Sequence, residues 1–115
     1  MNPRRLVLLA LAAVPVVAIA HHGWSEYDST QLLKLTGTIE ESGYTHPHGY
    51  INLKTPTKTW VAVLAPPSRM ESRGLAKDLM TVGATVTVEG YANKSKPEEM
   101  RAERIIVAGK TVELR

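Results

Sequence analysis

The four histidines are the residues of this 115-residue chain best suited to chemistry, and they form two short clusters. His21 and His22 are adjacent, and His46 and His48 flank Pro47. The chain has no cysteine, so a metal site would use imidazole, carboxylate, thioether or amine ligands. Nitrogen-rich tetragonal sites favour Cu(II), with zinc or nickel as alternatives. We therefore predict a copper site that draws its ligands from His21, His22, His46 and His48.

The residues before His21 have the pattern of a secretory signal peptide. Arg4 and Arg5 precede an unbroken apolar run over 6–20, which ends in Ala18-Ile19-Ala20. This run is shorter than the roughly 20 residues that a bilayer span needs, and no positive cluster follows it. We expect cleavage between Ala20 and His21, a periplasmic or secreted protein, and no stable membrane insertion after cleavage. An uncleaved anchor is the alternative.

Cleavage at this point would give His21 a free α-amine, which adds a metal ligand that internal histidines lack. The amine and the Nδ1 atom of the same imidazole can chelate one ion, and a third nitrogen from another histidine completes the arrangement called a histidine brace. A second geometry uses the α-amine with the amide and imidazole nitrogens of His22. Solvated histidines without a metal are the alternative, since imidazoles on loops are commonly hydrogen-bonded to water or backbone.

The second cluster falls in a predicted loop. If that loop is locally extended, His46 and His48 point the same way, because side chains two positions apart share a face. Pro47 restricts the backbone there and lowers the entropy cost of ordering a site. Glu26 and Asp28, close to the terminal histidines, are candidates to complete a coordination sphere or to orient an imidazole. Both carboxylates are equally compatible with simple solvation.

From residue 33 onward the chain shows short β-rich runs separated by turn residues. One or two helical turns are predicted between Pro66 and Met80. Gly37 predicts a bulge or a sharp bend that lets one strand serve two sheets of a small barrel. The predicted strands cover residues 33–40, 50–54, 59–64, 85–91, 100–107 and 111–114, the second and third forming a hairpin.

Three strands, a short helix and two or three further strands follow the order of the OB barrel. We therefore predict an all-β domain with one short helix, in the form of a small OB-like barrel of five to six strands. An SH3-like barrel and an open β-roll are the alternatives. The expected organisation is a signal peptide over 1–20, an N-terminal segment with the two histidines over 21–32, and the barrel domain over 33–115.

Charge and motif content exclude several classes of function. Beyond the signal peptide, Lys and Arg alternate with Glu and Asp, so no clustered basic face for nucleic acid is expected. No nucleophile elbow, phosphate-binding glycine loop or His-Glu-x-x-His motif is present, and we expect no enzyme. The acid pairs Glu40-Glu41 and Glu98-Glu99 are interpreted as solvated.

Two further sets of side chains have competing interpretations. Met70, Met80 and Met100 could supply thioethers to Cu(I), but they occupy core-type positions where methionine is an ordinary gap filler. Five aromatic residues could line a ligand-binding face, as they do on OB barrels, or cap the core. These are Trp24, Tyr27, Tyr44, Tyr50 and Trp60.

Five motifs, spread over most of the chain after the signal peptide, together give it a family resemblance. They are His21-His22-Gly23-Trp24-Ser25-x-Tyr27-Asp28, Leu35-Thr36-Gly37-Thr38-Ile39, Pro47-His48, Pro67 with Arg73-Gly74-Leu75, and Val82-Gly83 with Val86-x-Val88-x-Gly90-Tyr91. The chain resembles a family of small exported bacterial proteins of unknown function, which carry His-His-(Ser/Gly)-(Phe/Trp) after the signal peptide and Asn-Pro-His after the first strand. The resemblance implies a periplasmic OB-like barrel and no established activity. Its histidines fall on His21, His22 and His48, whereas His46 stands where relatives usually have Asn.

These observations predict a periplasmic, non-enzymatic Cu(II) protein for copper handling or tolerance, with the metal ion as its partner. The expected ligands are His21 with its α-amine, His48, and either His22 or His46. The rival hypothesis is a metal-free binding module whose barrel face recognises a small molecule, a glycan or an envelope protein through Trp60 and the tyrosines. The Arg73-Gly74 pair is interpreted as a turn that ends a helix.

Overall fold

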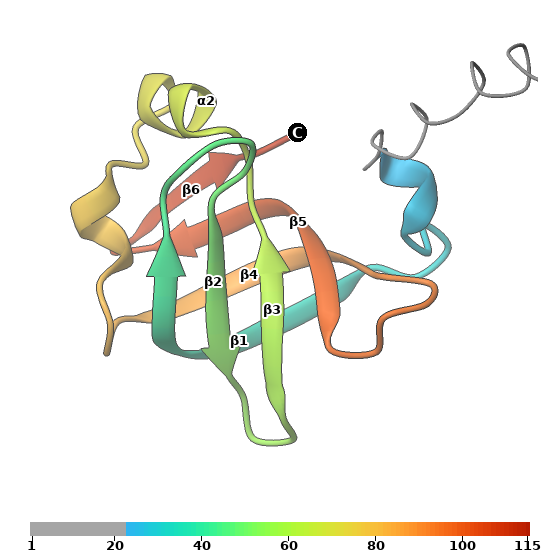
Figure 1. The fold of residues 1–115 in the computed structure, drawn as a ribbon. Coiled ribbons are helices and arrows are strands. Elements are labelled where there is room, and N and C mark those ends of the chain that lie inside the picture. Colours follow the sequence, from blue (N-terminus) through green and yellow to red (C-terminus); the bar gives the residue numbers. More distant parts are fainter. Residues whose placement is uncertain (1–22) are drawn as a thin grey trace, which may run out of the picture.

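The computed structural model describes residues 23–115, in which strands alternate with short helical segments (Figure 1). Residues 1–22, with the predicted signal peptide, His21 and His22, lie outside the described residues. In residues 23–115, no helix is long and apolar enough to cross a membrane. The elements are η2 (Trp24–Glu26), β1 (Leu33–Gly43), β2 (Tyr50–Lys54), β3 (Thr59–Val63), α2 (Pro67–Ser72), η3 (Lys77–Met80), β4 (Thr85–Ala92), β5 (Glu99–Val107) and β6 (Lys110–Glu113).

The strands form one sheet in the order β3-β2-β1-β4-β5-β6, and an additional pairing of β3 with β5 closes it. The β3–β5 pairing is parallel and joins Val61, Ala62 and Val63 to Glu99, Met100 and Arg101. Five strands therefore make a closed barrel, and β6 is an extra strand that pairs with β5. The fold is the predicted small all-β, OB-like barrel, and the predicted hairpin of β2 and β3 is present.

Strand β1 bends so that it pairs with two neighbours in succession. Residues 33–38 pair with β4, and residues 38–43 pair with β2. A Cβ atom on Gly37 would lie 2.2 Å from the carbonyl oxygen of Lys54, so only glycine permits the close approach at this bend. The predicted bend is confirmed, while the bulge itself lies between Ile39 and Glu41.

Gly90 lies within β4 at a close approach to β5. The strand predicted over 85–91 is present as β4, which ends one residue later at Ala92. The pairing register with β5 shifts between Glu89 and Gly90, and a Cβ atom on Gly90 would lie 1.9 Å from the carbonyl oxygen of Arg101. The glycine therefore allows two backbones to approach each other inside the barrel wall and does not end the strand.

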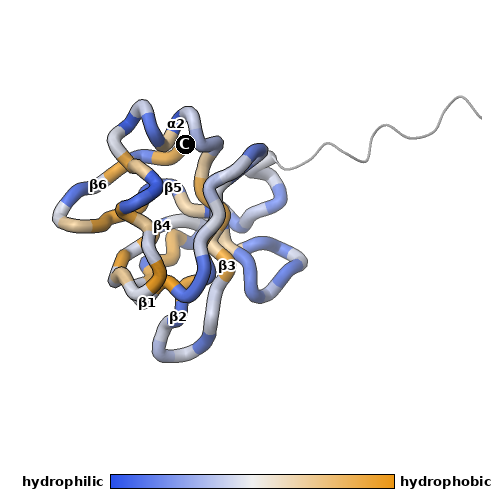
Figure 2. The backbone as a smooth tube through the Cα atoms, turned by 60° about the vertical axis from the view of Figure 1, so that its left-hand side comes forward, coloured by the Kyte–Doolittle hydropathy of each residue, from blue (hydrophilic) through white to orange (hydrophobic). Residues whose placement is uncertain are grey.

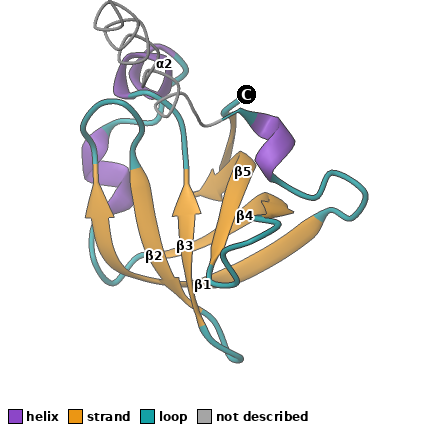
Figure 3. Cartoon of the chain, turned by 45° about the vertical axis from the view of Figure 1, so that its right-hand side comes forward, coloured by secondary structure: helices purple, strands orange, loops and turns teal. Residues whose placement is uncertain are grey.

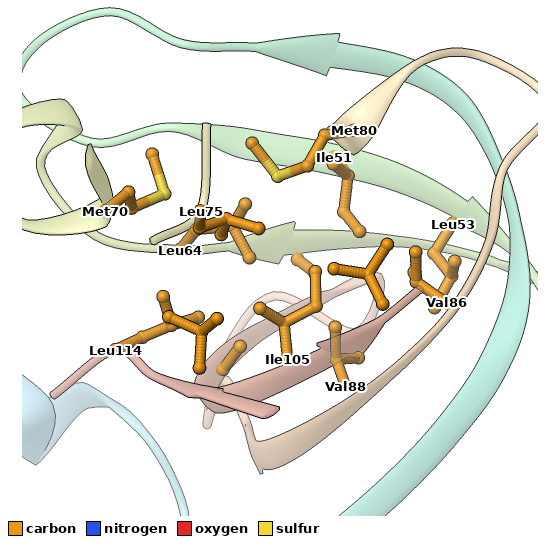
Figure 4. Close-up of a cluster of buried hydrophobic side chains, with 14 of the residues drawn as sticks. Ile51, Leu53, Leu64, Met70, Leu75, Met80, Val86, Val88, Ile105 and Leu114 are labelled. Atoms are coloured by element: carbon orange, nitrogen blue, oxygen red, sulfur yellow. The ribbon is translucent and has the colours of Figure 1, made fainter. Parts of the chain in front are cut away.

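Apolar side chains from all six strands and from the helical segments fill the barrel (Figure 4). In Figure 2 the orange hydrophobic stretches follow the strands, and the projecting loops are mostly blue or white. Met70, Met80 and Met100 are almost completely buried, as expected for gap fillers of a core without phenylalanine. The largest buried side chains are Ile39, Ile51, Leu53, Leu64, Met70, Leu75, Met80, Val86, Val88, Met100, Ile105 and Leu114.

Helix α2 ends at the predicted turn. Gly74 has a φ of +91°, its amide donates to the carbonyl of Glu71 over 3.1 Å, and the amide of Leu75 donates to the carbonyl of Met70 over 2.8 Å. This is the Schellman pattern, which favours glycine at the left-handed position. Arg73 also has a role that the sequence did not indicate, since its Nη1 donates to the carbonyl oxygens of Glu113 and Arg115.

Candidate functional site

A cavity of about 310 Å³ lies where the β1–β2 loop and the β4–β5 loop meet the paired strands β3 and β5. Val61 and Val63 give it an apolar wall, and Glu99, Arg101 and His48 give it charged or polar groups. In OB folds, the β2–β3 face and these two loops are the usual place for ligands. This cavity is therefore the candidate site.

The segment that follows His21 and His22 in the chain reaches this cavity. Glu26 and Tyr27 line it together with His48. The segment is held there by backbone hydrogen bonds from Lys94 to Glu26 (2.9 Å) and from Asp28 to Ala92 (2.8 Å). Figure 3 shows the short η2 helix near β5, and Trp24 of η2 contacts Arg101 of that strand. The fold thus brings Glu26 and Tyr27 of the N-terminal segment and His48 of the β1–β2 loop to one site.

His48 is half-buried in the cavity wall. Its pKa is lowered chiefly by burial and further by the positive charges of Arg101 and Arg69. A lowered pKa keeps the imidazole neutral near pH 7, the state in which one ring nitrogen offers a lone pair to a metal or a hydrogen-bond donor.

His46, unlike His48, lies outside the cavity. Its side chain is exposed and is not part of the cavity lining. Residues 46 and 47 form a bend, with a cis peptide bond between His46 and Pro47. The expectation that His46 and His48 share a face assumed an extended segment, and the bend removes that condition. The cavity includes only His48 of this pair.

The carboxylates of Glu26 and Asp28 differ in whether they face the cavity. Glu26 lines the cavity. The carboxylate of Asp28 instead accepts hydrogen bonds from the amide (3.0 Å) and the hydroxyl (2.5 Å) of Thr30, and these bonds lower its pKa. Of the two acids that the sequence indicated as accessory ligands, Glu26 is the one that faces the site.

Glu99 is a site residue that the sequence analysis missed. The acid pair was interpreted as solvated, yet Glu99 lines the cavity and accepts a hydrogen bond of 2.5 Å from the hydroxyl of Tyr27. Asn93 Nδ2 donates to the same carboxylate oxygen over 3.3 Å. Burial, followed by the hydrogen bond and charge of Glu99, raises the pKa of Tyr27 to about 12. Tyr27 is therefore a hydrogen-bond donor at neutral pH.

Arg101 is the second site residue that the sequence analysis missed. Only 7% of its surface is exposed, and it lines the cavity. Burial is the largest cause of its lowered pKa, and Arg69 and Arg115 lower it further. In the sequence Arg101 looks like an ordinary exposed position, because β5 also contains the charged residues Glu103 and Arg104, so the pattern gave no signal that Arg101 is buried.

Only two of the five aromatic candidates, Tyr27 and Tyr50, line the cavity. Trp60 packs against the core, because Val61 and Val63 occupy the opposite face of β3 and line the site. Tyr44 also packs against the core, and its hydroxyl donates to the carbonyl of Leu75 over 2.7 Å. The expectation that Trp60 contributes to a ligand-binding face is therefore wrong for this cavity.

A family model described as "Family of unknown function (DUF6152)" matches residues 9–100, which is most of the chain. The chain belongs to DUF6152. This agrees with the resemblance to a family of unknown function, and the matched range begins within the predicted signal peptide. No curated protein matches the DUF6152 chain.

Solved structures support the fold of this DUF6152 protein. A chain in the crystal structure of a complex of TiaS with an isoleucine transfer RNA and ATP matches with a TM-score of 0.52 and 21% sequence identity. The match covers 74% of the DUF6152 chain but only 19% of the other chain, so the DUF6152 chain corresponds to a small part of that protein. At this identity the likeness shows the fold alone.

Within residues 23–115 of the DUF6152 protein, no three His, Asp or Glu side chains gather closely enough to hold a metal ion. His48 and Glu26 do line one cavity. His21 and His22 lie outside this range.

Proposed function

We propose that this DUF6152 protein is an exported, non-enzymatic copper-binding protein, periplasmic or secreted, that serves copper handling or tolerance. Cu(II) is held by the α-amine and imidazole of His21, by His48, and by either His22 or His46. The signal peptide is removed between Ala20 and His21, which frees the α-amine. In this proposal the His21-His22 and Pro47-His48 motifs of this chain supply metal ligands.

One observation carries the proposal: Glu26 and Tyr27 line the same cavity as His48. The five residue steps from Glu26 back to His21 span at most about 18 Å of extended chain. The N-terminal segment is docked on the barrel by hydrogen bonds at Glu26 and Asp28. A docked segment lowers the entropy cost of bringing His21 to His48, because fewer residues remain to be ordered when the metal binds.

The carboxylate of Glu26 supplies a negative charge at such a site. A divalent cation beside Arg101 is disfavoured by the like charge, and a nearby carboxylate offsets this repulsion. Glu26 and Arg101 line the same cavity, and the charge of Glu26 stabilises protonated Arg101. Glu26 is thus placed to complete the coordination of Cu(II) or to balance its charge.

The deciding experiment measures Cu(II) affinity by competition with a chelator, coupled to EPR. It uses protein that has been exported and processed so that His21 is free, the same protein with one extra N-terminal alanine, and His48→Ala. Tight binding with a nitrogen-rich tetragonal spectrum, lost in both variants, supports the proposal. Loss on extension alone indicates a local His21-His22 chelate. Micromolar or weaker binding that tolerates the added residue contradicts the proposal, and parallel titrations with zinc and nickel establish the metal preference.

A second candidate function is a metal-free binding module. It is favoured by the position of the cavity, which lies where OB folds bind their ligands, and by the apolar wall of Val61 and Val63 beside Tyr50. This candidate requires ligand binding that is indifferent to an extra N-terminal alanine. The extended variant therefore separates the two functions.

A further inference from the structure

Trp24 lies against two arginines. The guanidinium carbons of Arg101 and Arg115 are each 4.4 Å from the centroid of the indole ring. The ring of Tyr91 meets the indole edge-on, with centroids 6.2 Å apart and an angle of 79° between the planes. Cations over an indole face are attracted by its negative electrostatic potential, and tryptophan is the best aromatic partner for this interaction.

The barrel itself holds Arg115 in place. Arg73 Nη1 donates to the carbonyl oxygen of Arg115 over 3.0 Å, and the guanidinium of Arg115 lies 3.7 Å from a carboxylate oxygen of Glu103. The preceding residue, Leu114, is buried in the core, and its amide donates to the carbonyl of Glu103 over 2.7 Å. Trp24 therefore packs on a part of the chain that the core fixes.

Arg101 connects this contact to the candidate site. It lines the cavity with His48, and its charge lowers the pKa of that histidine. The like charge of Arg115 opposes that of Arg101, whereas the carboxylate of Glu26 stabilises it. The like charges of Arg101 and Arg115 repel each other, so an indole ring that both guanidinium groups contact stabilises their positions.

We infer that Trp24, held by Arg101 and Arg115, is the anchor that positions the mature N-terminus at the His48 cavity. We call these three residues the Trp24 anchor. His21 precedes Trp24 by three residue steps, which span at most about 11 Å. The inference rests on the proposed copper function for its ligand, but the anchor itself is testable without metal. Trp24, Arg101 and Arg115 act here as positioning residues, since none of them is assigned as a metal ligand.

The first test measures hydrogen exchange in the metal-free protein. The amides of Glu26 and Tyr27 donate to the carbonyls of Gly23 and Trp24 in η2, so their exchange reports whether the segment is docked. We expect exchange at these amides to be at least about tenfold faster in Trp24→Ala and in Arg115→Gln, since each variant removes a contact that holds the segment. Arg115→Lys keeps a cation at this position and should restore much of the protection.

Arg104→Gln is the matched control. Arg104 also lies on β5 and also forms ion pairs, with Glu89 and Glu113, but it makes none of the described contacts to Trp24. Its loss should leave exchange at Glu26 and Tyr27 unchanged. Unchanged exchange in both Trp24→Ala and Arg115→Gln would overturn the inference. If Trp24→Ala does not fold, Arg115→Gln and Arg115→Lys still decide the matter.

The second test measures Cu(II) affinity in the same variants with His21 free. Trp24→Ala should weaken binding by about tenfold or more, because the freed segment must be ordered when the metal binds. Faster exchange without any loss of affinity would show that the anchor does not position the site, and the inference would fail. If wild-type protein binds no copper tightly, the proposed function fails, while the exchange data still decide whether the anchor exists.

Discussion

Tyr27 donates its hydroxyl hydrogen to Glu99 over 2.5 Å, although the two residues are 72 positions apart in the chain. Tyr27 belongs to the segment that follows the predicted cleavage site, and Glu99 begins β5. Both residues line the cavity that contains His48. This contact joins the N-terminal segment to the barrel wall at the candidate site.

Replacing Tyr27 by phenylalanine should destabilise the fold. Tyr27 is 5% exposed, and the substitution leaves the half-buried carboxylate of Glu99 without its shortest hydrogen bond. We expect the free energy of unfolding to fall by about 1.5–3 kcal/mol, the range for hydrogen bonds to charged groups. Urea denaturation measures this change. Tyr50→Phe, which removes a hydrogen bond to the exposed Glu41, is the control and should have a smaller effect, so equal losses would contradict the prediction.

The pKa of about 12 for Tyr27 should make the stability of the fold fall at alkaline pH. The unfolded chain loses this proton near pH 10. Because the folded-state pKa is raised, the contribution of Tyr27 to stability is fully present below about pH 10 and is lost as the pH rises from 10 through 12. Ultraviolet absorbance should show one tyrosine that ionises near pH 12 in wild type and not in Tyr27→Phe. Ionisation of Tyr27 near pH 10 in the folded protein would refute this assignment.

His48 should titrate below about 6.5, the usual value for histidine, in the metal-free protein. Because its folded-state pKa is lowered, the stability linked to this group is present above pH 6.5 and is lost as the pH falls through the folded-state value. Arg69→Gln removes one positive charge and should raise the pKa of His48. NMR titration of the imidazole measures both effects. Arg73→Gln, which removes another arginine near the end of α2 that bonds to backbone carbonyls, should leave the pKa of His48 unchanged.

The two histidines of the β1–β2 loop should differ in their importance for Cu(II). His48 lines the cavity, whereas His46 is exposed outside it. We expect His48→Ala to weaken Cu(II) binding by more than the roughly 10–100-fold that loss of an outer partner costs a metal site. His46→Ala should weaken binding less than His48→Ala in chelator competition, because His46 is exposed outside the cavity. The reverse order of effects would exclude His48 as the principal ligand of this loop.

Gly90→Ala should destabilise the barrel. The added Cβ atom would lie 1.9 Å from the carbonyl oxygen of Arg101, and backbone atoms cannot easily move away. We expect a loss of about 2–3 kcal/mol from this overpacking, measured by chemical denaturation. Gly23→Ala is the matched substitution, since its nearest neighbour is the Ser25 hydroxyl oxygen at 3.8 Å and its φ is −80°. Similar losses for both variants would show that the close approach at Gly90 is not the cause.

Local patterns were sufficient to predict most of the elements. Strand β2 alternates between buried and more exposed positions, and a short turn that contains Pro56 separates it from the β-rich run of β3, which is why their hairpin was predictable. The end of α2 at Gly74 was also predictable, because the left-handed turn there depends on one residue type. The close backbone approach at Gly90 was not predictable, since a glycine near the end of a strand and a glycine that admits a neighbouring backbone look alike in sequence.

The site was only partly predictable. Both faces of β3 are apolar, with Trp60 and Ala62 on one face and Val61 and Val63 on the other. Periodicity alone could not decide which face turns inward, so only the structure showed that Trp60 packs against the core, which was one of the two interpretations left open. Glu99 looked like an ordinary solvated acid, because its partner Tyr27 is distant in the chain and is brought near only by folding.

The sequence by itself determined the strand order along the chain, the helix end and the two histidine clusters, because these depend on residue types within a few positions of one another. Only the tertiary structure decided that β3 and β5 close the barrel and that Glu26, Tyr27 and His48 line one cavity. The physical reason is that barrel closure and cavity formation depend on contacts between residues far apart in the chain, which the core and the strand register select together.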